Sequence, residues 1–367
     1  MQINLIKKKV SYKFIKFTFL PLEKIKFFFY KKYSKFCFIS DNASWATDNT
    51  TNFIIKFFNK FNVDTIKIFH EPKNQFVFYT DQYSILKKNF FKYKNIVAID
   101  YQHGMGKYLE NNRKLLSKVK KFQKYIKLIR VTNSYFKKYL IKNGINKDKL
   151  FQIPLTVDTN FFKPYKNKKE LRKKFNLPIN KILIGSFHKD GNGWDDGLTP
   201  KLIKGPDIFI KTINEIKKKI GRDQFAVVLT APARGYIKER LTKNSIEFFH
   251  FYPFQFSNLP ELYNCLDLYL ISSRDEGGPT GMFEAMACGI PVVSTKVGSA
   301  HDHIRNFYNG FKCEINDFLS LSYFSLKILF DLKLRKRVIT NSLKTAKKNN
   351  FINHQKMWKL FFKKFQK

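Results

Sequence analysis

The sequence predicts an α/β fold made of two doubly wound, Rossmann-like domains, and three observations support this prediction. The chain has 367 residues, which suits two domains of roughly 150 to 200 residues better than one. Short runs rich in β-branched and aromatic residues alternate with lysine-bearing helical patterns, as in parallel sheets covered by helices. This alternation occurs in both halves of the chain, so each half is expected to form its own sheet.

The first half contains the candidate elements of the first domain. Strands are expected at residues 36–40, 65–69, 75–79, 96–100, 128–132 and 151–154, with helical patterns that include 49–61 and 133–143. The second half repeats the alternation. Its strands are expected at 182–187, 226–230, 247–251, 268–271 and 291–294, and its helices at 206–220, 259–265, 280–288 and 318–332. A last helical pattern, 351–365, carries Trp358, Phe361, Phe362 and Phe365.

The chain is strongly basic, with 69 Lys and Arg against 28 Asp and Glu and a net charge of +41. A polyanionic partner is one explanation of this charge. Lysine, phenylalanine, isoleucine, asparagine and tyrosine are all abundant, however, which is also what an AT-rich coding sequence produces without selection for binding. Both explanations stay open.

Several absences in the sequence indicate a cytoplasmic protein. No run of about 18 or more uncharged apolar residues predicts a transmembrane helix. Lys13 and Lys16 interrupt the N-terminal apolar residues, which argues against a signal peptide. The four cysteines have no paired spacing for zinc or for a disulfide framework, and no metal site is expected.

The N-terminal segment suggests contact with a membrane surface. Residues 1–40 carry ten lysines and a single acid, Glu23, interleaved with phenylalanines. A basic, aromatic segment can lie on an anionic bilayer, and each nearby lysine contributes on the order of 1 kcal/mol. Peripheral contact with the inner face of a membrane is therefore a hypothesis. The alternative is a basic tail that leads into the first strand.

The most informative segment runs from the predicted strand at 268–271, through a glycine-rich loop, into the helix at 280–288, which Gly289 ends. The first turn of this helix offers unpaired N–H groups and the positive end of the helix dipole, which attract a diphosphate. Glu276 and Glu284 lie around this turn. Carboxylates repel phosphates, so their natural partners are the hydroxyl groups of a sugar or a ribose. The segment therefore suggests a nucleotide-sugar site.

These residues resemble a known family. Glu276 and Glu284 match the E-x7-E motif of the retaining glycosyltransferases of the GT-B fold, family four, also called glycosyltransferases group one. The run EAMACGIPVV from Glu284 to Val293 is similar to the continuation of that motif almost letter for letter. Residues 151–164 resemble the family's passage from the N-terminal domain into the linker.

The resemblance implies the GT-B architecture, in which two Rossmann-like domains face each other across a cleft. The acceptor-side domain would span residues 1–164 and the nucleotide-sugar-binding domain residues 165–350. A C-terminal helix in 351–367 would cross back to the first domain.

The resemblance also implies a role for individual residues. Glu276 would orient the hydroxyls of the donor sugar, Glu284 would bind the ribose and Lys204 would neutralise the diphosphate. His103, after the strand at 96–100, resembles the family's histidine that touches the donor sugar. Backbone amides of Gly278, Pro279 and Thr280 would hold sugar and phosphate. The complete set comprises the catalytic residues Glu276, His103 and Lys204 and the donor-binding residues Lys189, Gly278, Pro279, Thr280, Gly281 and Glu284.

One expected residue is missing. The family usually places an arginine after the strand glycine, but Gly185 is here followed by the residues SFHK. We hypothesise that Lys189 supplies the second positive charge, with Lys201 as the less favoured substitute. Two ammonium groups near a diphosphate would assist its departure, because negative charge grows there in the transition state.

The resemblance implies transfer of a sugar from a nucleotide-sugar donor to a saccharide or lipid-linked acceptor, with retention of configuration and without a metal or other cofactor. Synthesis of surface polysaccharide, lipopolysaccharide or glycolipid is the expected context. Two alternatives remain: a nucleotide-sugar epimerase of the same fold, and a basic polyanion- or membrane-binding protein with a vestigial cleft. No nucleic-acid partner is expected.

Overall fold

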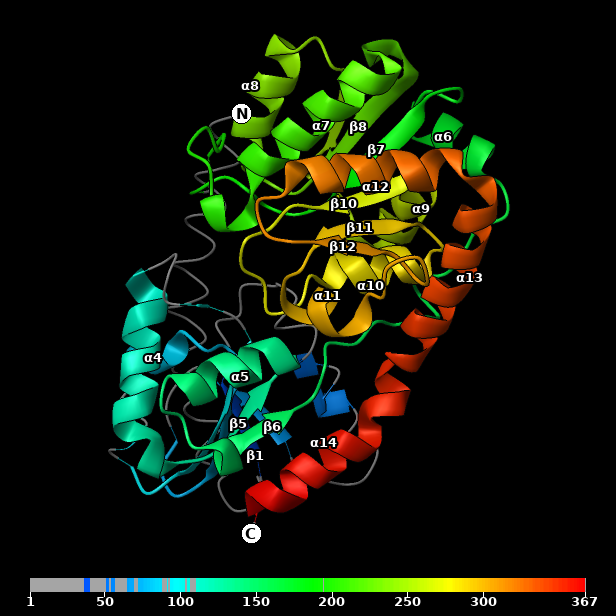
Figure 1. Cartoon of the computed structure of the whole chain (residues 1–367). Helices are drawn as coiled ribbons and strands as arrows, with labels where there is room; N and C mark the ends of the chain where they lie inside the picture. The colour runs from blue at the N-terminus through cyan, green and yellow to red at the C-terminus, as the bar shows by residue number, and fades with distance from the viewer. Residues whose placement is uncertain are drawn as a thin grey trace.

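The computed structural model describes residues 36–39, 51–52, 54–56, 65–68, 72–87, 91, 93–102, 104–105, 110–193 and 195–366. Within these residues, twelve strands form two six-stranded sheets, and every strand pair is parallel. The two sheets occupy separate halves of the molecule (Figure 1). The predicted fold class is therefore confirmed.

The first sheet has the strand order β2-β1-β3-β4-β5-β6, so the direction of winding reverses between β1 and β3. Its strands are β1 (Phe36–Ile39), β2 (Thr65–Ile68), β3 (Phe76–Tyr79), β4 (Ile96–Asp100), β5 (Ile126–Val131) and β6 (Leu150–Gln152). Its helices include α3 (Ser84–Lys87), α4 (Glu110–Phe122) and α5 (Ser134–Lys142). Only residues 51–52 and 54–56 of the helix expected at 49–61 are described, and they are helical.

The second sheet has the order β12-β11-β10-β7-β8-β9, with its reversal between β7 and β10. Its strands are β7 (Ile182–Ser186), β8 (Phe225–Thr230), β9 (Phe248–Phe251), β10 (Leu268–Ile271), β11 (Val292–Thr295) and β12 (Phe311–Cys313). The helices around it are α6 (Lys168–Lys174), α7 (Pro206–Ile220), α8 (Gly235–Lys243), α9 (Leu259–Asn264), α10 (Thr280–Ala287), α11 (Gly298–His303), α12 (Phe318–Phe330) and α13 (Leu332–Lys348). Short 3-10 turns connect these elements: η1 (Gln123–Tyr125), η2 (Lys147–Lys149), η3 (Leu202–Lys204), η4 (Arg222–Gln224) and η5 (Phe256–Asn258).

Both faces of the second sheet are buried, as a parallel sheet requires. Alternate residues of each strand enter opposite cores: Tyr269 and Ile271 of β10 pack with α9 and α10, whereas Leu268 and Leu270 pack with α7, α8 and α12. Successive side chains of a strand point to opposite faces, so continuous apolar runs predicted these strands well. The expected boundaries differ from the observed ones by one or two residues at most strands, which is ordinary for strand ends.

Several elements were missed by the sequence prediction. β12 has three residues, too few to show a periodicity, and α6 and α13 are so rich in lysine and arginine that few apolar positions mark their buried face. The helix expected at 318–332 ends at Phe330 because the Asp331 side chain accepts a hydrogen bond from Leu334 N and caps α13 instead.

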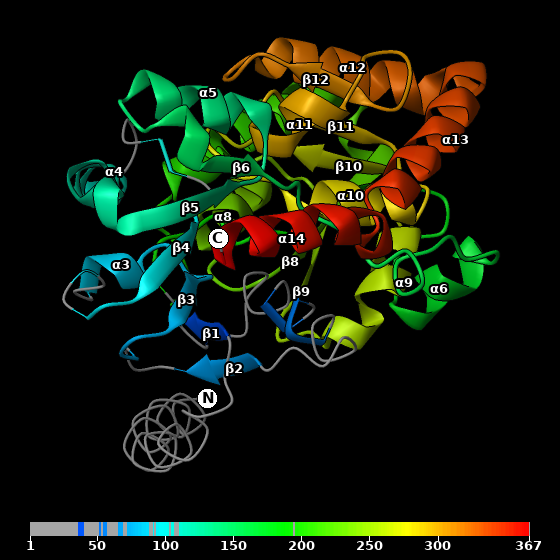
Figure 2. The same cartoon turned by 90° about the horizontal axis from the view of Figure 1, so that it is seen from below.

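The last helix, α14 (Phe351–Gln366), lies against the first sheet although α13 packs on the second (Figures 1 and 2). Trp358, Phe361, Phe362 and Phe365 of α14 share a core with residues of β1, β3, β4 and β5. The last helix therefore packs on the sheet that holds the first described strand, β1. No helix in the described part of the chain is long and apolar enough to cross a bilayer.

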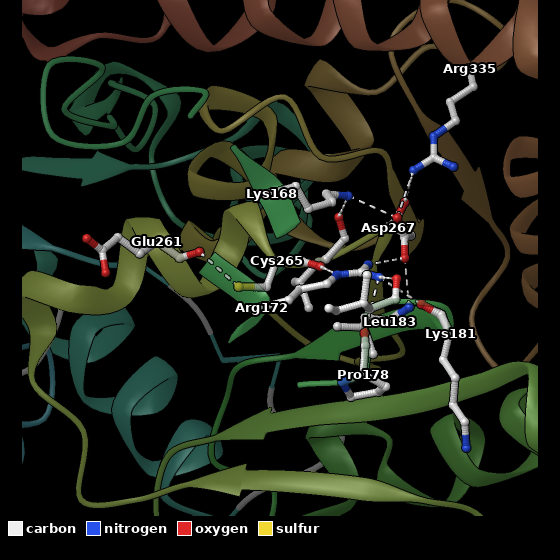
Figure 3. A network of polar contacts seen from close by, with 11 residues as sticks. Lys168, Arg172, Pro178, Lys181, Leu183, Glu261, Cys265, Asp267 and Arg335 are labelled. Carbon is white, nitrogen blue, oxygen red and sulfur yellow. Dashed lines mark hydrogen bonds and ion pairs between the residues drawn. The ribbon is translucent and has the colours of Figure 1, made fainter. Parts of the chain in front are cut away.

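The amino ends of β7 and β10 are joined by a charged network (Figure 3). Asp267 accepts hydrogen bonds from Leu183 N at 2.8 Å and from Arg172 at 2.5 Å, and forms an ion pair with Lys168 at 2.9 Å. Arg335 of α13 reaches the same carboxylate at 3.4 Å. This network lies at the edge of the sheet opposite the carboxyl ends of the strands. It fastens α6 and α13 to the second sheet.

We expect Trp358→Ala to lower the free energy of unfolding by about 3–5 kcal/mol, because it empties a large volume in the core beneath α14. Trp358 is 1% exposed, whereas its neighbour Met357 is 37% exposed. Thermal unfolding of Trp358→Ala and of the control Met357→Ala tests this. Equal melting temperatures for the two variants would show that α14 does not support the fold in this way.

Candidate functional site

The candidate site lies where the strand order of the second sheet reverses. β7 and β10 are neighbours in register, with Leu268 opposite Ile184 and Tyr269 opposite Gly185. The segments that leave their carboxyl ends therefore start side by side. In open α/β sheets such a switch point is where ligands bind. Most of the residues predicted from the sequence lie on these two segments.

An ion pair joins the two segments. Lys204 Nζ lies 2.6 Å from Glu276 Oε1, and the Ser273 hydroxyl donates to the same carboxylate oxygen at 3.0 Å. Gly205, at φ +63°, places Lys204 there, because a Cβ at this position would lie 2.0 Å from the Ser272 carbonyl oxygen. The glycine thus allows the chain to turn from η3 into α7 against the end of β10.

Glu284 lies on α10 beneath its first turn. Tyr263 of α9 donates a hydrogen bond to Glu284 Oε2 at 2.8 Å. Burial raises the pKa of Glu284 to about 7, and the Tyr263 hydrogen bond opposes this shift. Glu284 is partly exposed, so its carboxylate can accept a hydrogen bond from a ligand hydroxyl.

The first turn of α10 carries backbone donors that no side chain caps in the described structure. Thr280 and Gly281 contribute N–H groups there. Pro279 has no N–H, so the expectation that its amide holds a ligand is wrong. A Cβ on Gly281 would lie 2.4 Å from the Tyr269 hydroxyl, which shows that close packing also requires this glycine.

The loop between β10 and α10 touches the first domain. The Gly277 carbonyl accepts hydrogen bonds from Thr132 Oγ1 and from Asn133 Nδ2, the latter at 2.6 Å. Asp275 Oδ2 accepts a hydrogen bond from Met105 N at 2.8 Å. These donors follow β4 and β5 of the first sheet. His103 lies outside the described residues, although Gly104 and Met105 beside it are described.

The segment after β7 brings further charged groups to the site. Lys189 is half-buried there, and burial lowers its pKa. Burial also lowers the pKa of His188 to about 3, with help from the charges of Arg234 and Lys204, so this imidazole is neutral. Lys201 lies near Lys204, Glu276 and Lys189, whose charges act on its pKa in that decreasing order.

Among the described residues, Arg234 is a functional candidate that the sequence prediction missed. It follows β8, and its guanidinium enters the loop after β7, where it forms an ion pair with Asp190 at 3.0 Å. A signal existed in the sequence: a lone arginine among small residues, directly after a buried strand. Nothing local, however, connected residue 234 to the segment at 186–190.

Among the described residues, no three His, Cys, Asp or Glu side chains gather in a way that could hold a metal ion. Metal independence of the site remains a prediction.

Comparison with known proteins identifies the second half of the chain. Residues 198–345 match the family described as Glycosyl transferases group 1. This match covers less than half of the chain. The match contains Glu284 and both partners of the Lys204–Glu276 ion pair.

Two curated relatives match part of the chain at similar sequence identity. The lipopolysaccharide core biosynthesis mannosyltransferase LpsB of Rhizobium meliloti (strain 1021) is 29% identical over 150 residues, 39% of each chain. The N-acetyl-alpha-D-glucosaminyl L-malate synthase of Bacillus anthracis is 32% identical over 81 residues, which are 22% of this chain and 21% of the relative. The chain thus matches well under half the length of these relatives.

Solved structures resemble almost the whole chain. Anabaena HepE in complex with UDP-glucose superposes with a TM-score of 0.70 at 16% identity, covering 89% of this chain and 99% of that one. Sucrose-phosphate synthase from Thermosynechococcus elongatus gives a TM-score of 0.72 at 15% identity, covering 91% and 99%. These likenesses show that the two-domain arrangement is the GT-B fold.

We expect the stability of the protein to fall between about pH 4.5 and 7, in part because of Glu284. Its pKa is raised on folding, so the folded chain binds the proton more tightly than the unfolded chain across this window. The stability it contributes is complete below the window and is lost as the pH rises through the folded pKa. Glu284→Gln should therefore lose less stability between pH 5 and pH 8 than the parent.

Melting temperatures at the two pH values measure this difference. The exposed carboxylate of Glu314, which pairs with Lys296 at 3.0 Å, provides the control variant Glu314→Gln. An unchanged pH dependence in Glu284→Gln would contradict the burial of Glu284 as a protonated acid. Burial also raises the pKa values of Asp190 and Asp275 to about 6. Part of the pH dependence of stability therefore remains in every variant.

Proposed function

We propose that this chain is a retaining glycosyltransferase that moves a sugar from a nucleotide-sugar donor to an acceptor hydroxyl. One observation carries the proposal: Lys204 and Glu276 form an ion pair in front of the uncapped first turn of α10, and Glu284 lies one turn into that helix. This arrangement combines an anion site with two carboxylates that accept hydrogen bonds from hydroxyls. The family match over 198–345 supports the same reaction class.

The proposed donor site uses each group for the chemistry it suits. The Lys204 ammonium and the N–H groups of Thr280 and Gly281 would bind the diphosphate. Glu284 would accept hydrogen bonds from the ribose, and Glu276 from the hydroxyls of the transferred sugar. Without ligand, Lys204 and Glu276 neutralise each other at 2.6 Å.

The remaining predicted residues complete this proposal. Lys189 would lie near the phosphates, and the backbone of Gly278 and Pro279 would border the sugar. His103 would approach the donor sugar from the first domain. Its neighbour Met105 supports this placement, because Met105 N donates to Asp275, the residue before Glu276.

The proposed reaction needs no side-chain base. The bond from the anomeric carbon to the phosphate oxygen breaks, and its electron pair goes to the departing diphosphate. The acceptor oxygen bonds to the same face of the anomeric carbon and gives its proton to the departing phosphate oxygen. Lys204 stabilises the negative charge that develops on this leaving group. Configuration at the anomeric carbon is thus retained, and no metal or other cofactor is part of the proposal.

We further propose a saccharide or lipid-linked acceptor and a role in surface polysaccharide, lipopolysaccharide or glycolipid synthesis. The name of the Rhizobium meliloti relative, a lipopolysaccharide core mannosyltransferase, supports this context. The Anabaena neighbour binds UDP-glucose, which supports a nucleotide-sugar donor for the shared fold. A cytoplasmic enzyme at the inner face of a membrane fits such an acceptor.

An anionic membrane surface is the proposed partner of the basic regions. The segment 1–29 lies outside the described residues. In the described part, α14 supports the proposal, because its outer face presents exposed Lys356 and Lys363 beside Ile352 and Leu360, which are 64% and 56% exposed. From residue 332 to 367 the chain has twelve Lys and Arg and no Asp or Glu. An exposed basic helix with apolar residues suits a bilayer interface.

The decisive activity test follows release of free nucleoside diphosphate from UDP-, GDP- and ADP-sugars, with and without an acceptor alcohol. We expect release that depends on the acceptor. Conversion of the donor sugar without an acceptor and without release would favour the epimerase. A complete lack of turnover and of nucleotide stabilisation would favour the polyanion-binding alternative.

We expect Glu284→Ala to weaken binding of the nucleoside diphosphate about 10- to 150-fold, since a charge-assisted hydrogen bond contributes about 1.5–3 kcal/mol. Titration calorimetry with UDP, GDP and ADP measures the affinity. Glu314→Ala, which removes an exposed carboxylate that pairs with Lys296, is the control. Equal affinity of Glu284→Ala and the parent would reject the ribose assignment.

We expect the double variant Lys356→Gln/Lys363→Gln to bind vesicles of phosphatidylglycerol and phosphatidylcholine about 30-fold more weakly, since each lysine contributes about 1 kcal/mol. Sedimentation with vesicles of the full chain measures this. Lys120→Gln/Lys121→Gln removes two exposed lysines of α4 and is the matched control. The same loss in both double variants would show that only net charge matters, and no loss would remove α14 from the proposal.

A further inference from the structure

The segment between β7 and η3 forms a hairpin that is docked onto the loop after β8. We refer to residues 190–193 and 195–201 as the β7–η3 hairpin. Gly191 and Pro200 form an antiparallel bridge, and Asn192 N donates to the Thr199 carbonyl at 2.9 Å. Two further backbone hydrogen bonds fasten the tip, from Gly235 N to Asp196 O at 2.6 Å and from Tyr236 N to Gly197 O at 3.0 Å.

The contact between the hairpin and the β8–α8 loop is too close for side chains. A Cβ on Gly191 or on Gly197 would lie 2.3 Å from the Ala233 carbonyl oxygen. Ala233 itself has a positive φ of 56°, a conformation that a residue with a side chain seldom adopts. Such a residue persists only where the surrounding structure holds it. The hairpin therefore has one defined position.

A fully buried ion pair fixes the base of the hairpin. Arg234 Nε lies 3.0 Å from Asp190 Oδ1, and both side chains are 0% exposed. The same guanidinium donates to the Ser186 carbonyl at 2.8 Å and to the Thr230 carbonyl at 3.1 Å. The Arg234 guanidinium therefore makes its contacts with buried groups of the protein and is not available to a ligand.

A buried ion pair of this kind is a poor source of stability, because desolvation of the two charges offsets most of their attraction. Its better-supported use is to specify one arrangement of the chain. Here the ion pair holds the two ends of the hairpin in one position relative to each other. Lys189 directly precedes Asp190, and Lys201 N donates to the Asp190 carbonyl at 2.7 Å.

Lys201 also begins the turn that carries Lys204. Lys204 N donates to the Lys201 carbonyl at 2.8 Å, and Lys201 is the N-cap residue of η3. Lys201 is partly buried at the start of this turn, and the charges of Lys204 and Glu276 act on its ammonium group more strongly than that of Lys189 does.

We propose that Lys201 is the second cation for the donor diphosphate and that the buried Asp190–Arg234 pair positions it. The inference rests on the proposed function and names a ligand-binding residue and two positioning residues for it. Lys201, on the hairpin, takes the place of the arginine that is missing after Gly185. Arg234 holds the base of the hairpin through its ion pair with Asp190. As the bond to the anomeric carbon breaks, the electron pair passes to the diphosphate oxygen, whose charge Lys201 and Lys204 then share.

A pH dependence of binding follows from the same geometry. Burial, together with the charges of Lys204 and Lys189 and against that of Glu276, lowers the pKa of Lys201 to about 8 in the ligand-free protein. Above this pH the Lys201 amine of the free protein is neutral, so an anion that binds its ammonium form can bind only after Lys201 takes up a proton. Affinity for a nucleoside diphosphate should therefore fall as the pH rises above about 8.

The test is titration calorimetry of UDP, GDP and ADP with the full chain at pH 7 and pH 9. Lys201→Met should weaken binding about tenfold or more at pH 7, as expected for loss of a charge-assisted hydrogen bond, and should abolish the pH dependence. Lys189→Met removes the cation that the sequence favoured and should weaken binding less than Lys201→Met does. Arg234→Met should weaken binding and shift the pH dependence, because Lys201 is then misplaced.

Arg172→Met is the matched control for the buried arginine. Arg172 is also buried and paired with Asp267 at 2.5 Å, but it lies at the opposite edge of the same sheet (Figure 3). Arg172→Met should lower the melting temperature and leave the nucleotide affinity of the folded protein, and its dependence on pH, unchanged. An equal loss of affinity in Arg172→Met and Arg234→Met would overturn the positioning role.

Two other outcomes overturn the inference in distinguishable ways. If Lys201→Met binds nucleotide like the parent while Glu284→Ala binds weakly, the proposed function stands and the role of Lys201 is wrong. If the parent binds none of the three nucleoside diphosphates, both the proposed function and the role of Lys201 fail.

Discussion

The reversal of strand order between β7 and β10 is the constraint on which the site depends. Two segments that are about 70 residues apart in the chain leave adjacent strands at the same edge of the sheet. The ion pair of Lys204 and Glu276, at 2.6 Å, is the direct result. The ammonium can bind a diphosphate, and the carboxylate beside it can accept hydrogen bonds from the hydroxyls of a sugar.

The same loop also connects the two domains. Gly277 accepts hydrogen bonds from Thr132 and Asn133, and Asp275 accepts one from Met105. The residues on either side of Glu276 are therefore held by the first sheet, while Glu276 itself is held by Lys204 and Ser273 of the second. α14 fastens the end of the chain to the first sheet through Trp358 and three phenylalanines. The position of Glu276 thus depends on how the two domains meet.

The sequence predicted what is local and missed what is long-range. Glu276 and Glu284 could be predicted as site residues because a helix-opening loop and its carboxylates lie within one short segment, and their roles stay predictions. The apolar strands were predicted correctly because each is a continuous run. Arg234 was missed because its contact with Asp190 joins two loops with no shared pattern. β12 was too short to recognise, and the assignment of an amide to Pro279 neglected its missing N–H. The role of His103 stays a prediction, because this residue lies outside the described residues.

Hydrogen–deuterium exchange of the full chain, with and without a nucleoside diphosphate, tests the central claim most directly. The N–H groups at the start of α10 and in the segment after β7 are those that a bound diphosphate would cover or immobilise at the switch point. We predict that ligand slows exchange in peptides covering residues 276–287 and 187–205 and leaves α4 unchanged. Slowed exchange confined to other parts of the chain, or none at saturating ligand, would contradict a donor site between β7 and β10.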